Sequence, residues 1–313
     1  MSASGSPLTE PPRGPRARRP VSHARSRRLA GLAALGLAVA GVATGVPSPA
    51  GAATLAGGYV AMGDSYTSGP GIATAREGSG LCTRSDHNYP SLVAAAVKPA
   101  SFRDVSCSGA TTAGITGTQY GQPAQLDAVD SSTRLVTIGI GGNDAGLIGA
   151  GSTCVFLALF DGQGSPCRTV YTYTGTDTLR QSIAAAQPTI RATIQAVKQR
   201  APQARILLVG YPNLLPPSKA QCDPSVDDSA IADGDVPWLH DINVEVNRAW
   251  AATAAAAGVE YVDTFTPGVG HETCQRVGVR WVEGVANITN GAPIHPNGDG
   301  MAAFARLVVA KLG

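Results

Sequence analysis

Short apolar segments alternate with longer helical patterns along this chain, and this alternation constrains its fold more than any other feature. Strands are predicted near residues 59–62, 102–106, 134–140, 205–210 and 259–265. Helices are predicted near residues 89–97, 177–200, 237–257 and 298–312. Alternating strands and helices are typical of a parallel sheet with helices on both faces. The sequence therefore predicts an α/β fold, a three-layer α/β/α sandwich with about five parallel strands.

Distinctive polar residues follow three of the predicted strands and precede the last helix. Ser65 follows the first strand, Gly109 the second and Asn143 the third, while His295 lies just before the final helix. The carboxyl ends of parallel strands lie at one edge of the sheet, where ligands bind in such folds. We therefore expect these four residues to gather at that edge.

These four residues carry the functional groups that acyl transfer requires. A serine hydroxyl becomes a good nucleophile when a neighbouring base accepts its proton, and imidazole does so near neutral pH. Ser65 is therefore the predicted nucleophile and His295 the predicted general base. The backbone N–H groups of Ser65 and Gly109 and the side-chain amide of Asn143 are the predicted oxyanion hole, in which losing one donor typically costs ~10²–10³ in turnover.

The same residues lie in four blocks that resemble those of the SGNH (GDSL) hydrolase family. The blocks are Gly63-Asp64-Ser65, Gly109, Gly142-Asn143-Asp144 and His295. Further segments narrow the resemblance to secreted actinobacterial lipases and esterases, namely Asn88-Tyr89-Pro90, Cys107-Ser108-Gly109-Ala110, Gly139 to Gly146 and Gly210-Tyr211-Pro212. The resemblance implies one flavodoxin-like SGNH hydrolase domain over residues 53–313. Neither Gly-x-x-x-x-Gly-Lys nor Gly-x-Gly-x-x-Gly occurs, so no cofactor is expected. No Gly-x-Ser-x-Gly occurs in the sequence, which argues against the nucleophile elbow of α/β-hydrolases.

One position departs from the pattern of that family. Family members commonly have an Asp three residues before the catalytic His, whereas this chain has Ala292. Some relatives that resemble this chain orient the imidazole with a backbone carbonyl at that position. The resemblance therefore implies a Ser–His dyad in which the Ala292 carbonyl accepts a hydrogen bond from the His295 ring.

The chain contains six cysteines, all after residue 52. An even number behind a secretion signal predicts three disulfides, and spacing alone leaves fifteen pairings open. The family resemblance implies pairing in sequence order, Cys82–Cys107, Cys154–Cys167 and Cys222–Cys274. A metal site is the alternative, but neither Cys-x-x-Cys nor His-Glu-x-x-His occurs, so no metal is expected.

The first 52 residues have the order of a secretory signal peptide. Seven arginines precede the apolar run 29–46, and Ala50-Gly51-Ala52 offers small residues for cleavage. We therefore expect a secreted, extracellular protein without a stable membrane anchor, and we expect a monomer. Without this segment the chain has 17 basic and 21 acidic residues, so a nucleic-acid partner is not expected.

The predicted function is hydrolysis of fatty-acyl esters, either small molecules or lipids, through a Ser65 acyl-enzyme. Phospholipid acyl chains and acetylated carbohydrates are alternative substrates, and a catalytically silent lipid- or sugar-binding module is the non-enzyme alternative. Segments 147–173 and 213–236 are predicted as loops that shape the acyl site. Pro188 lies inside the helix predicted over 177–200 and is expected to kink or break it.

Overall fold

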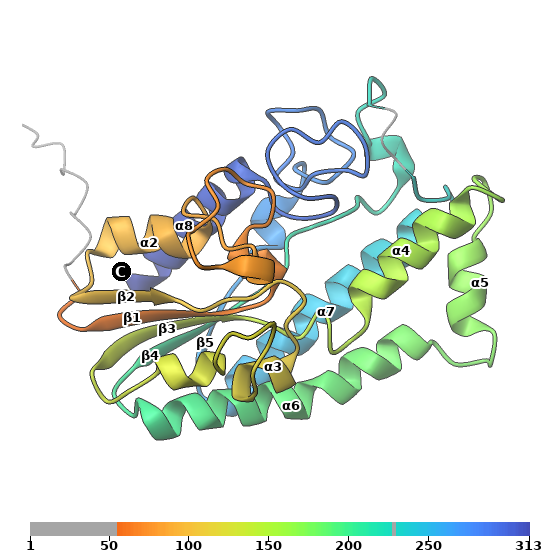
Figure 1. Cartoon of the computed structure of the whole chain (residues 1–313). Helices are drawn as coiled ribbons and strands as arrows, with labels where there is room; N and C mark the ends of the chain where they lie inside the picture. The colour runs from red at the N-terminus through yellow and green to blue at the C-terminus, as the bar shows by residue number, and fades with distance from the viewer. Residues whose placement is uncertain (1–54, 227–229) are drawn as a thin grey trace, which may run out of the picture. The chain divides into compact units, whose positions relative to one another are not determined.

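Five parallel strands form the central sheet of the computed structural model, which describes residues 55–226 and 230–313. In chain order they are β1 (Gly58–Gly63), β2 (Ser101–Asp104), β3 (Thr133–Gly139), β4 (Arg205–Val209) and β5 (Glu260–Val262). They lie side by side in the order β2-β1-β3-β4-β5 (Figure 1). The signal peptide predicted over residues 1–52 lies outside the described residues.

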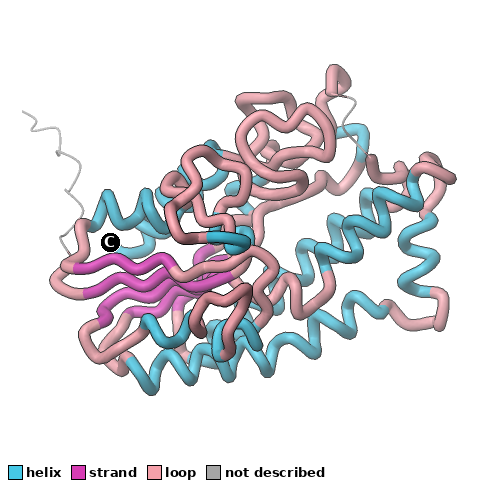
Figure 2. Tube along the Cα trace, viewed as in Figure 1, coloured by secondary structure: helices cyan, strands magenta, loops and turns pink. Residues whose placement is uncertain are grey.

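Helices cover both faces of this sheet and complete a three-layer sandwich (Figure 2). On one face α2 (Tyr89–Val97) packs beside α8 (Gly298–Leu312), and on the other α6 (Thr178–Arg200) packs beside α7 (Val236–Ala257). The remaining helices are α1 (Ser65–Ser68), α3 (Thr112–Thr116), α4 (Leu147–Ala158) and α5 (Pro166–Thr172), with the 3-10 helices η1 (Gly80–Cys82), η2 (Gln125–Ala128), η3 (Lys219–Gln221) and η4 (Thr266–Gly268). The predicted α/β/α fold class is confirmed.

The strand β1 shows why the sheet is buried on both sides. Successive side chains of a strand point to opposite faces. Tyr59 and Ala61 pack in the core beneath α2 and α8, whereas Val60 and Met62 pack in the core beneath α6 and α7. Every residue of β1 is therefore buried, and its carboxyl end lies between those of β2 and β3.

The structure corrects two predictions about local structure. Pro188 does not break α6, which continues from Thr178 to Arg200, so only the kink stays a prediction. A proline inside a helix typically costs ~3 kcal/mol, and the buried face around Ile183 and Ile190 offsets that cost by packing on the sheet. Segment 147–173 is not a loop, because it contains α4 and α5. Its glycines and β-branched residues have low helix propensity, so the sequence pattern did not predict either helix.

Three disulfides join segments that lie outside the sheet. They pair Cys82 with Cys107, Cys154 with Cys167, and Cys222 with Cys274. The predicted pairing in sequence order is confirmed, and no cysteine in the described part of the chain is free. Such bridges typically contribute ~2–4 kcal/mol each to stability. Within the same residues, no helix is long and apolar enough to cross a membrane.

Candidate active site

Ser65 is the first residue of α1 and follows β1 directly at the carboxyl edge of the sheet. The sharp exit from β1 needs a glycine, since Gly63 has a φ of 150° and a Cβ there would lie 2.4 Å from the Gly139 carbonyl oxygen. Asp64 then caps α1 by accepting a hydrogen bond from the Tyr66 backbone N–H at 2.9 Å. Neighbouring residues in the sequence therefore set the direction of Ser65, which is only 5% exposed.

The structure brings His295 into hydrogen-bonding contact with Ser65. The His295 Nε2 atom lies 2.8 Å from the Ser65 Oγ atom, and its Nδ1 atom lies 2.7 Å from the Pro293 carbonyl oxygen. A carbonyl oxygen can only accept, so Nδ1 carries the proton and Nε2 presents its lone pair to the serine hydroxyl. Burial lowers the pKa of His295, and the bond to Pro293 opposes this in part. The imidazole is therefore a neutral base near pH 7.

The prediction that the Ala292 carbonyl orients the imidazole was wrong by one residue. That carbonyl accepts instead from the backbone N–H of His295, at 3.1 Å, and closes a tight turn. Ile294 inside the turn has a φ of 58°, which is unusual for a β-branched residue. The turn directs the His295 ring toward the carbonyl of Pro293, two residues upstream, and away from that of Ala292.

The loop that carries His295 is held by pairing with the segment around Glu283. Glu283 donates its backbone N–H to the His295 carbonyl at 2.9 Å, and its own carbonyl accepts from Ile294 at 3.1 Å. The Glu283 carboxylate is fully buried, where it pairs with Arg280 and accepts from the Thr289 hydroxyl at 2.9 Å. The bonds of the Glu283 carboxylate to Arg280 and Thr289 therefore help to hold the loop in place.

Tyr66 connects the turn at Ser65 to the same loop. Its hydroxyl donates to the Ile294 carbonyl at 2.5 Å, and its ring centroid lies 5.0 Å from that of His295. Sequence analysis did not predict this contact between Tyr66 and the loop. The position directly after Ser65 was the only available signal, because the acceptor lies 228 residues away in the chain.

Tyr211 joins the ends of three strands and was also missed. It follows β4, its hydroxyl donates to Asp64 Oδ2 at 2.5 Å, and the same hydroxyl accepts from the Gly142 N–H at 2.8 Å. Burial raises the pKa of Asp64 to about 7, although the bond from Tyr211 acts in the opposite direction. The segment Gly210-Tyr211-Pro212 contributed to the family resemblance, and that resemblance was the signal that could have identified Tyr211.

The three predicted oxyanion donors border the same strand ends. Within the ranges that the structure describes, no hydrogen bond engages the backbone N–H of Ser65 or Gly109. Gly109 has a φ of 76°, so the conformation of this turn favours glycine. Asn143 uses one side-chain N–H on the Ala110 carbonyl at 2.8 Å and keeps the second available. Three donors are thus free to bind an anionic oxygen.

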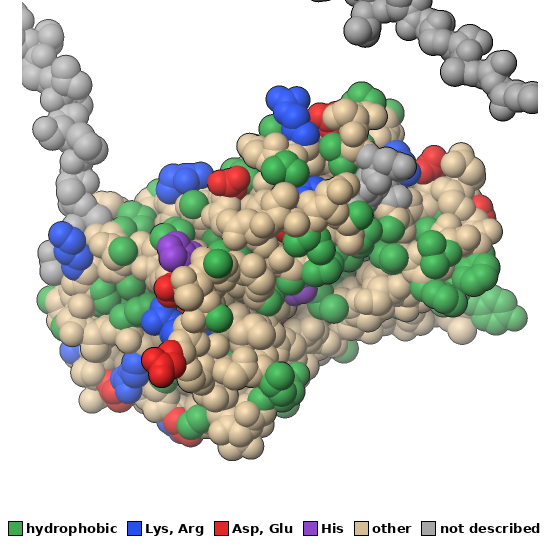
Figure 3. Space-filling view, turned by 45° about the horizontal axis from the view of Figure 1, so that its top comes forward, with side chains coloured by type: hydrophobic (Ala, Val, Ile, Leu, Met, Phe, Trp, Pro, Cys, Tyr) green, Lys and Arg blue, Asp and Glu red, His purple; other side chains and the backbone are tan. Residues whose placement is uncertain are grey.

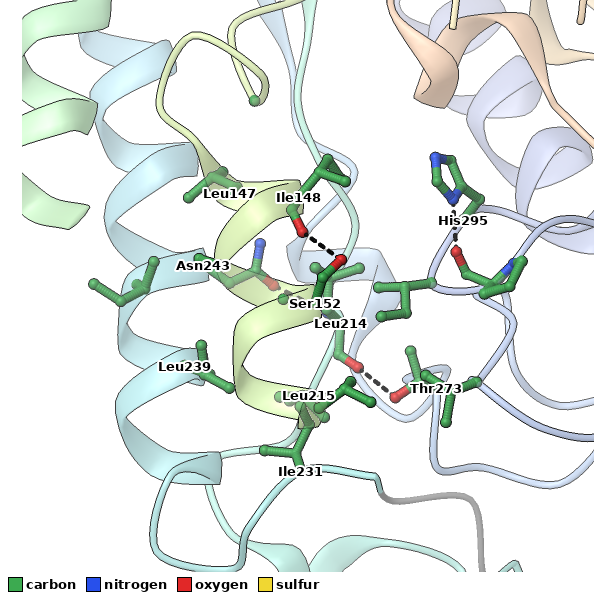
Figure 4. A pocket seen from close by; sticks show the side chains of 18 of the residues that line it. Leu147, Ile148, Ser152, Leu214, Leu215, Ile231, Leu239, Asn243, Thr273 and His295 are labelled. Atoms are coloured by element: carbon green, nitrogen blue, oxygen red, sulfur yellow. Dashed lines mark hydrogen bonds between the residues drawn. The ribbon is translucent and has the colours of Figure 1, made fainter. Parts of the chain in front are cut away.

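An apolar pocket opens beside His295. Its walls come from α4, from α7 and from the segments around residues 214 and 285, and Figure 4 shows its side chains around one hollow with His295 at the edge. Asn243 and Thr273 are polar but already bond to the backbone of Leu214. No Asp, Glu, Lys or Arg occurs among the described residues that line it. The pocket therefore suits an uncharged, apolar group.

Comparison with known proteins places this site in a family. The family model for GDSL-like lipases and acylhydrolases matches residues 61–303. The chain belongs to this family. It is therefore an ester hydrolase of the lipase and esterase type, and the SGNH (GDSL) assignment predicted from the four blocks is confirmed.

Relatives in this hydrolase family include curated proteins and solved structures. Lipase 2 of Streptomyces coelicolor is 37% identical over 259 residues, which cover 82% of this chain and 85% of that protein. The crystal structure of phospholipase A1 from Streptomyces albidoflavus covers 82% of this chain and 98% of its own, with a TM-score of 0.67 and 31% identity. An extracellular lipase structure from Streptomyces rimosus has a TM-score of 0.61 at 29% identity, covering 82% and 99%.

The carboxylates of this hydrolase do not contact the imidazole in the described residues. Asp263 accepts hydrogen bonds from the backbone of Phe265 and Thr266, and Glu283 pairs with Arg280. The His295 ring bonds only to Ser65 and to the Pro293 carbonyl. Ser65 and His295 therefore form a hydrogen-bonded pair, and a backbone carbonyl oxygen instead of a carboxylate orients the imidazole.

Proposed function

We propose that this chain hydrolyses fatty-acyl carboxylic esters through a Ser65 acyl-enzyme, with His295 as general base. The observation that carries the proposal is the hydrogen bond between Ser65 Oγ and His295 Nε2 at the mouth of the uncharged pocket. The Pro293 carbonyl already fixes the tautomer of His295 that the reaction needs. No proton therefore has to move before substrate binds.

The chemistry follows from these positions. Ser65 Oγ attacks the ester carbonyl carbon while its proton passes to His295 Nε2. The carbonyl oxygen becomes negatively charged and is bound by the N–H groups of Ser65, Gly109 and Asn143. The ester C–O bond then breaks, and the leaving alkoxide takes the proton from His295. Water, activated by His295, hydrolyses the acyl-enzyme in the second half of the reaction. The Pro293 carbonyl keeps the imidazolium oriented throughout.

The pocket favours an acyl chain over a sugar as the group bound beside Ser65. A carbohydrate needs hydrogen-bonding partners for its hydroxyls, whereas this lining is mostly leucine, isoleucine, valine and glycine. The cavity has a volume of about 220 Å³, below the roughly 300–1,000 Å³ of pockets that enclose a whole drug-sized ligand. One acyl chain, not a complete lipid, therefore occupies it. Phospholipid acyl esters are the second candidate, because a structural relative is named phospholipase A1.

A matched pair of glycines tests the assignment of the pocket. Gly151 lines it and Gly149 does not, although both lie on α4 and a Cβ on either would meet nothing within 4 Å. We measure initial rates on p-nitrophenyl esters from acetate to palmitate, on phosphatidylcholine and on acetylated xylan. The native enzyme is expected to prefer acyl chains longer than acetate and to leave xylan intact. Gly151→Phe should shift the preference to shorter chains, while Gly149→Phe should not. Preference for acetylated xylan would refute the proposal.

We further propose that the chain is exported and acts outside the cell as a monomer. Three disulfides support this, since such bonds persist in oxidising compartments. A structural relative described as an extracellular lipase supports it too. Detection of the protein in culture medium, lacking residues 1–52 by mass spectrometry, is the expected result.

A further inference from the structure

Hydrophobic side chains gather on the outer side of α4 and α5. Six of the twelve large hydrophobic side chains that the described residues expose lie between residues 148 and 173. We call five of them the α4–α5 patch, and each is more than half exposed: Phe156, Leu159, Phe160, Val170 and Tyr173. Figure 3 shows hydrophobic side chains over this end of the molecule. Exposed apolar groups that cluster in this way mark an interaction surface.

The patch continues the wall of the apolar pocket. Ile148, Ser152 and Val155 line the pocket and lie on one face of α4, at helical spacings of four and three residues. Leu159 follows four residues after Val155 and so extends the same face outward. Phe156 and Phe160 lie beside it with their ring centroids 5.2 Å apart. A group that leaves the pocket along α4 therefore reaches the patch without crossing a charged surface.

The patch carries almost no charge. Between residues 145 and 173 the only charged side chains are Asp161 and Arg168, which cancel. Binding to an anionic surface would use a cluster of basic residues, and none occurs here. The partner surface must therefore be apolar and without net charge.

The exposed side chains are held in place by their own framework. The disulfide between Cys154 and Cys167 joins α4 to α5. The buried Asp235 accepts from the backbone N–H groups of Cys167, at 2.9 Å, and Arg168, at 2.8 Å, at the start of α5. Tyr171 stacks on Trp238 of α7 with ring centroids 5.9 Å apart. The outward position of the patch is thus fixed before any partner binds.

We propose that the α4–α5 patch docks this enzyme onto the surface of aggregated lipid that has no net charge. This inference rests on the proposed function, because fatty-acyl esters of long chain length form such aggregates in water. Docking by Phe156, Leu159 and Phe160 brings the α4 wall of the pocket to the lipid surface. An acyl chain then leaves the lipid and enters the pocket, with its ester group beside Ser65.

Vesicles of pure phosphatidylcholine test this proposal. Sedimentation binding is measured in the Ser65→Ala background, so that no lipid is hydrolysed. Phe156→Ser, Leu159→Ser and Phe160→Ser together should lower the partition coefficient at least ~tenfold, because each side chain loses the gain from leaving water. The control triple Leu81→Ser, Val244→Ser and Val277→Ser, which changes exposed side chains on other elements, should stay within about twofold. High salt should not release the native protein.

Two further measurements keep the test decisive. With Ser65 intact, the patch triple should hydrolyse soluble p-nitrophenyl butyrate normally but lose at least ~tenfold on phosphatidylcholine vesicles. A Leu159→Trp probe should shift its emission to the blue on vesicles, whereas a Val277→Trp probe should not. Equal vesicle binding by the two triples, release by salt, or a lipid-free dimer that the patch triple dissociates would overturn the docking proposal. Intact vesicle binding without hydrolysis of any ester would refute the proposed function alone.

Discussion

Ser65 lies at the end of a buried strand, whereas His295 lies in a long loop between β5 and α8. The strand end is determined within a few residues, by the glycine turn at Gly63 and the Asp64 cap. The loop instead depends on partners far along the chain, such as the Tyr66 hydroxyl. In this hydrogen-bonded pair, neighbours in the sequence position Ser65, whereas only tertiary contacts position His295.

Removing either member of the pair should have the largest effect. Ser65→Ala and His295→Ala should each lower kcat on p-nitrophenyl butyrate by about 10⁴ or more, because nucleophile and base act as one unit. Equal losses would show that Ser65 and His295 depend on each other, although different parts of the chain position them. Near-ultraviolet circular dichroism checks the fold, and a fluorophosphonate should label Ser65 alone. Undiminished activity in Ser65→Ala would refute the assignment.

Asn143→Ala should have the next largest effect. The side chain follows β3, so it lies at the carboxyl edge of the sheet, as Ser65 does. Loss of its free N–H should lower kcat by ~10²–10³ and leave KM nearly unchanged, because the donor acts on the charge that develops in the transition state. Steady-state kinetics on soluble esters measure both constants. A loss of less than tenfold would exclude Asn143 from the oxyanion hole.

Tyr66→Phe tests the contact that joins the turn at Ser65 to the loop that carries His295. The variant loses the hydrogen bond to Ile294, so the loop should relax and kcat should fall about tenfold, or ~1.4 kcal/mol. Tyr59→Phe is the matched control, because it loses one buried bond, 2.9 Å long, to Thr137 at a distance from the loop. Both variants should lose ~1 kcal/mol of unfolding free energy, but only Tyr66→Phe should lose turnover. Equal kcat values in the two variants would remove Tyr66 from the positioning of His295.

The smallest expected effect is on pH dependence. Burial lowers the pKa of His295 because the charged imidazolium is less well solvated there. The base therefore stays unprotonated to lower pH than a free imidazole, and the acidic limb of kcat/KM should have its midpoint below about pH 6.5. Rates on a soluble ester from pH 4 to 9 measure it. A midpoint near pH 6.5 would show that the loop leaves the imidazole exposed to water, and one above pH 7 would show that a carboxylate pairs with it.

Much of the fold and half of the candidate site were predictable from local patterns. Strand–helix alternation predicted the parallel sheet, and polar residues after strands predicted where Ser65, Gly109 and Asn143 lie. The disulfide pairing followed from the family resemblance, since spacing alone left it open. These features depend on neighbours in the sequence or on a shared family pattern, and both are visible in one chain.

The sequence by itself determined which residues are proposed as the nucleophile, the base and the oxyanion donors, because their chemistry and their places after strands and before the last helix can be recognised in short segments. Only the tertiary structure decided that Pro293 and not Ala292 orients the imidazole, and that Tyr66 and Tyr211 tie the site together. It also decided that segment 147–173 forms helices with an apolar outer face. Hydrogen-bond partners and the exposure of side chains depend on how segments far apart in the sequence pack together, and a local sequence pattern does not show that packing.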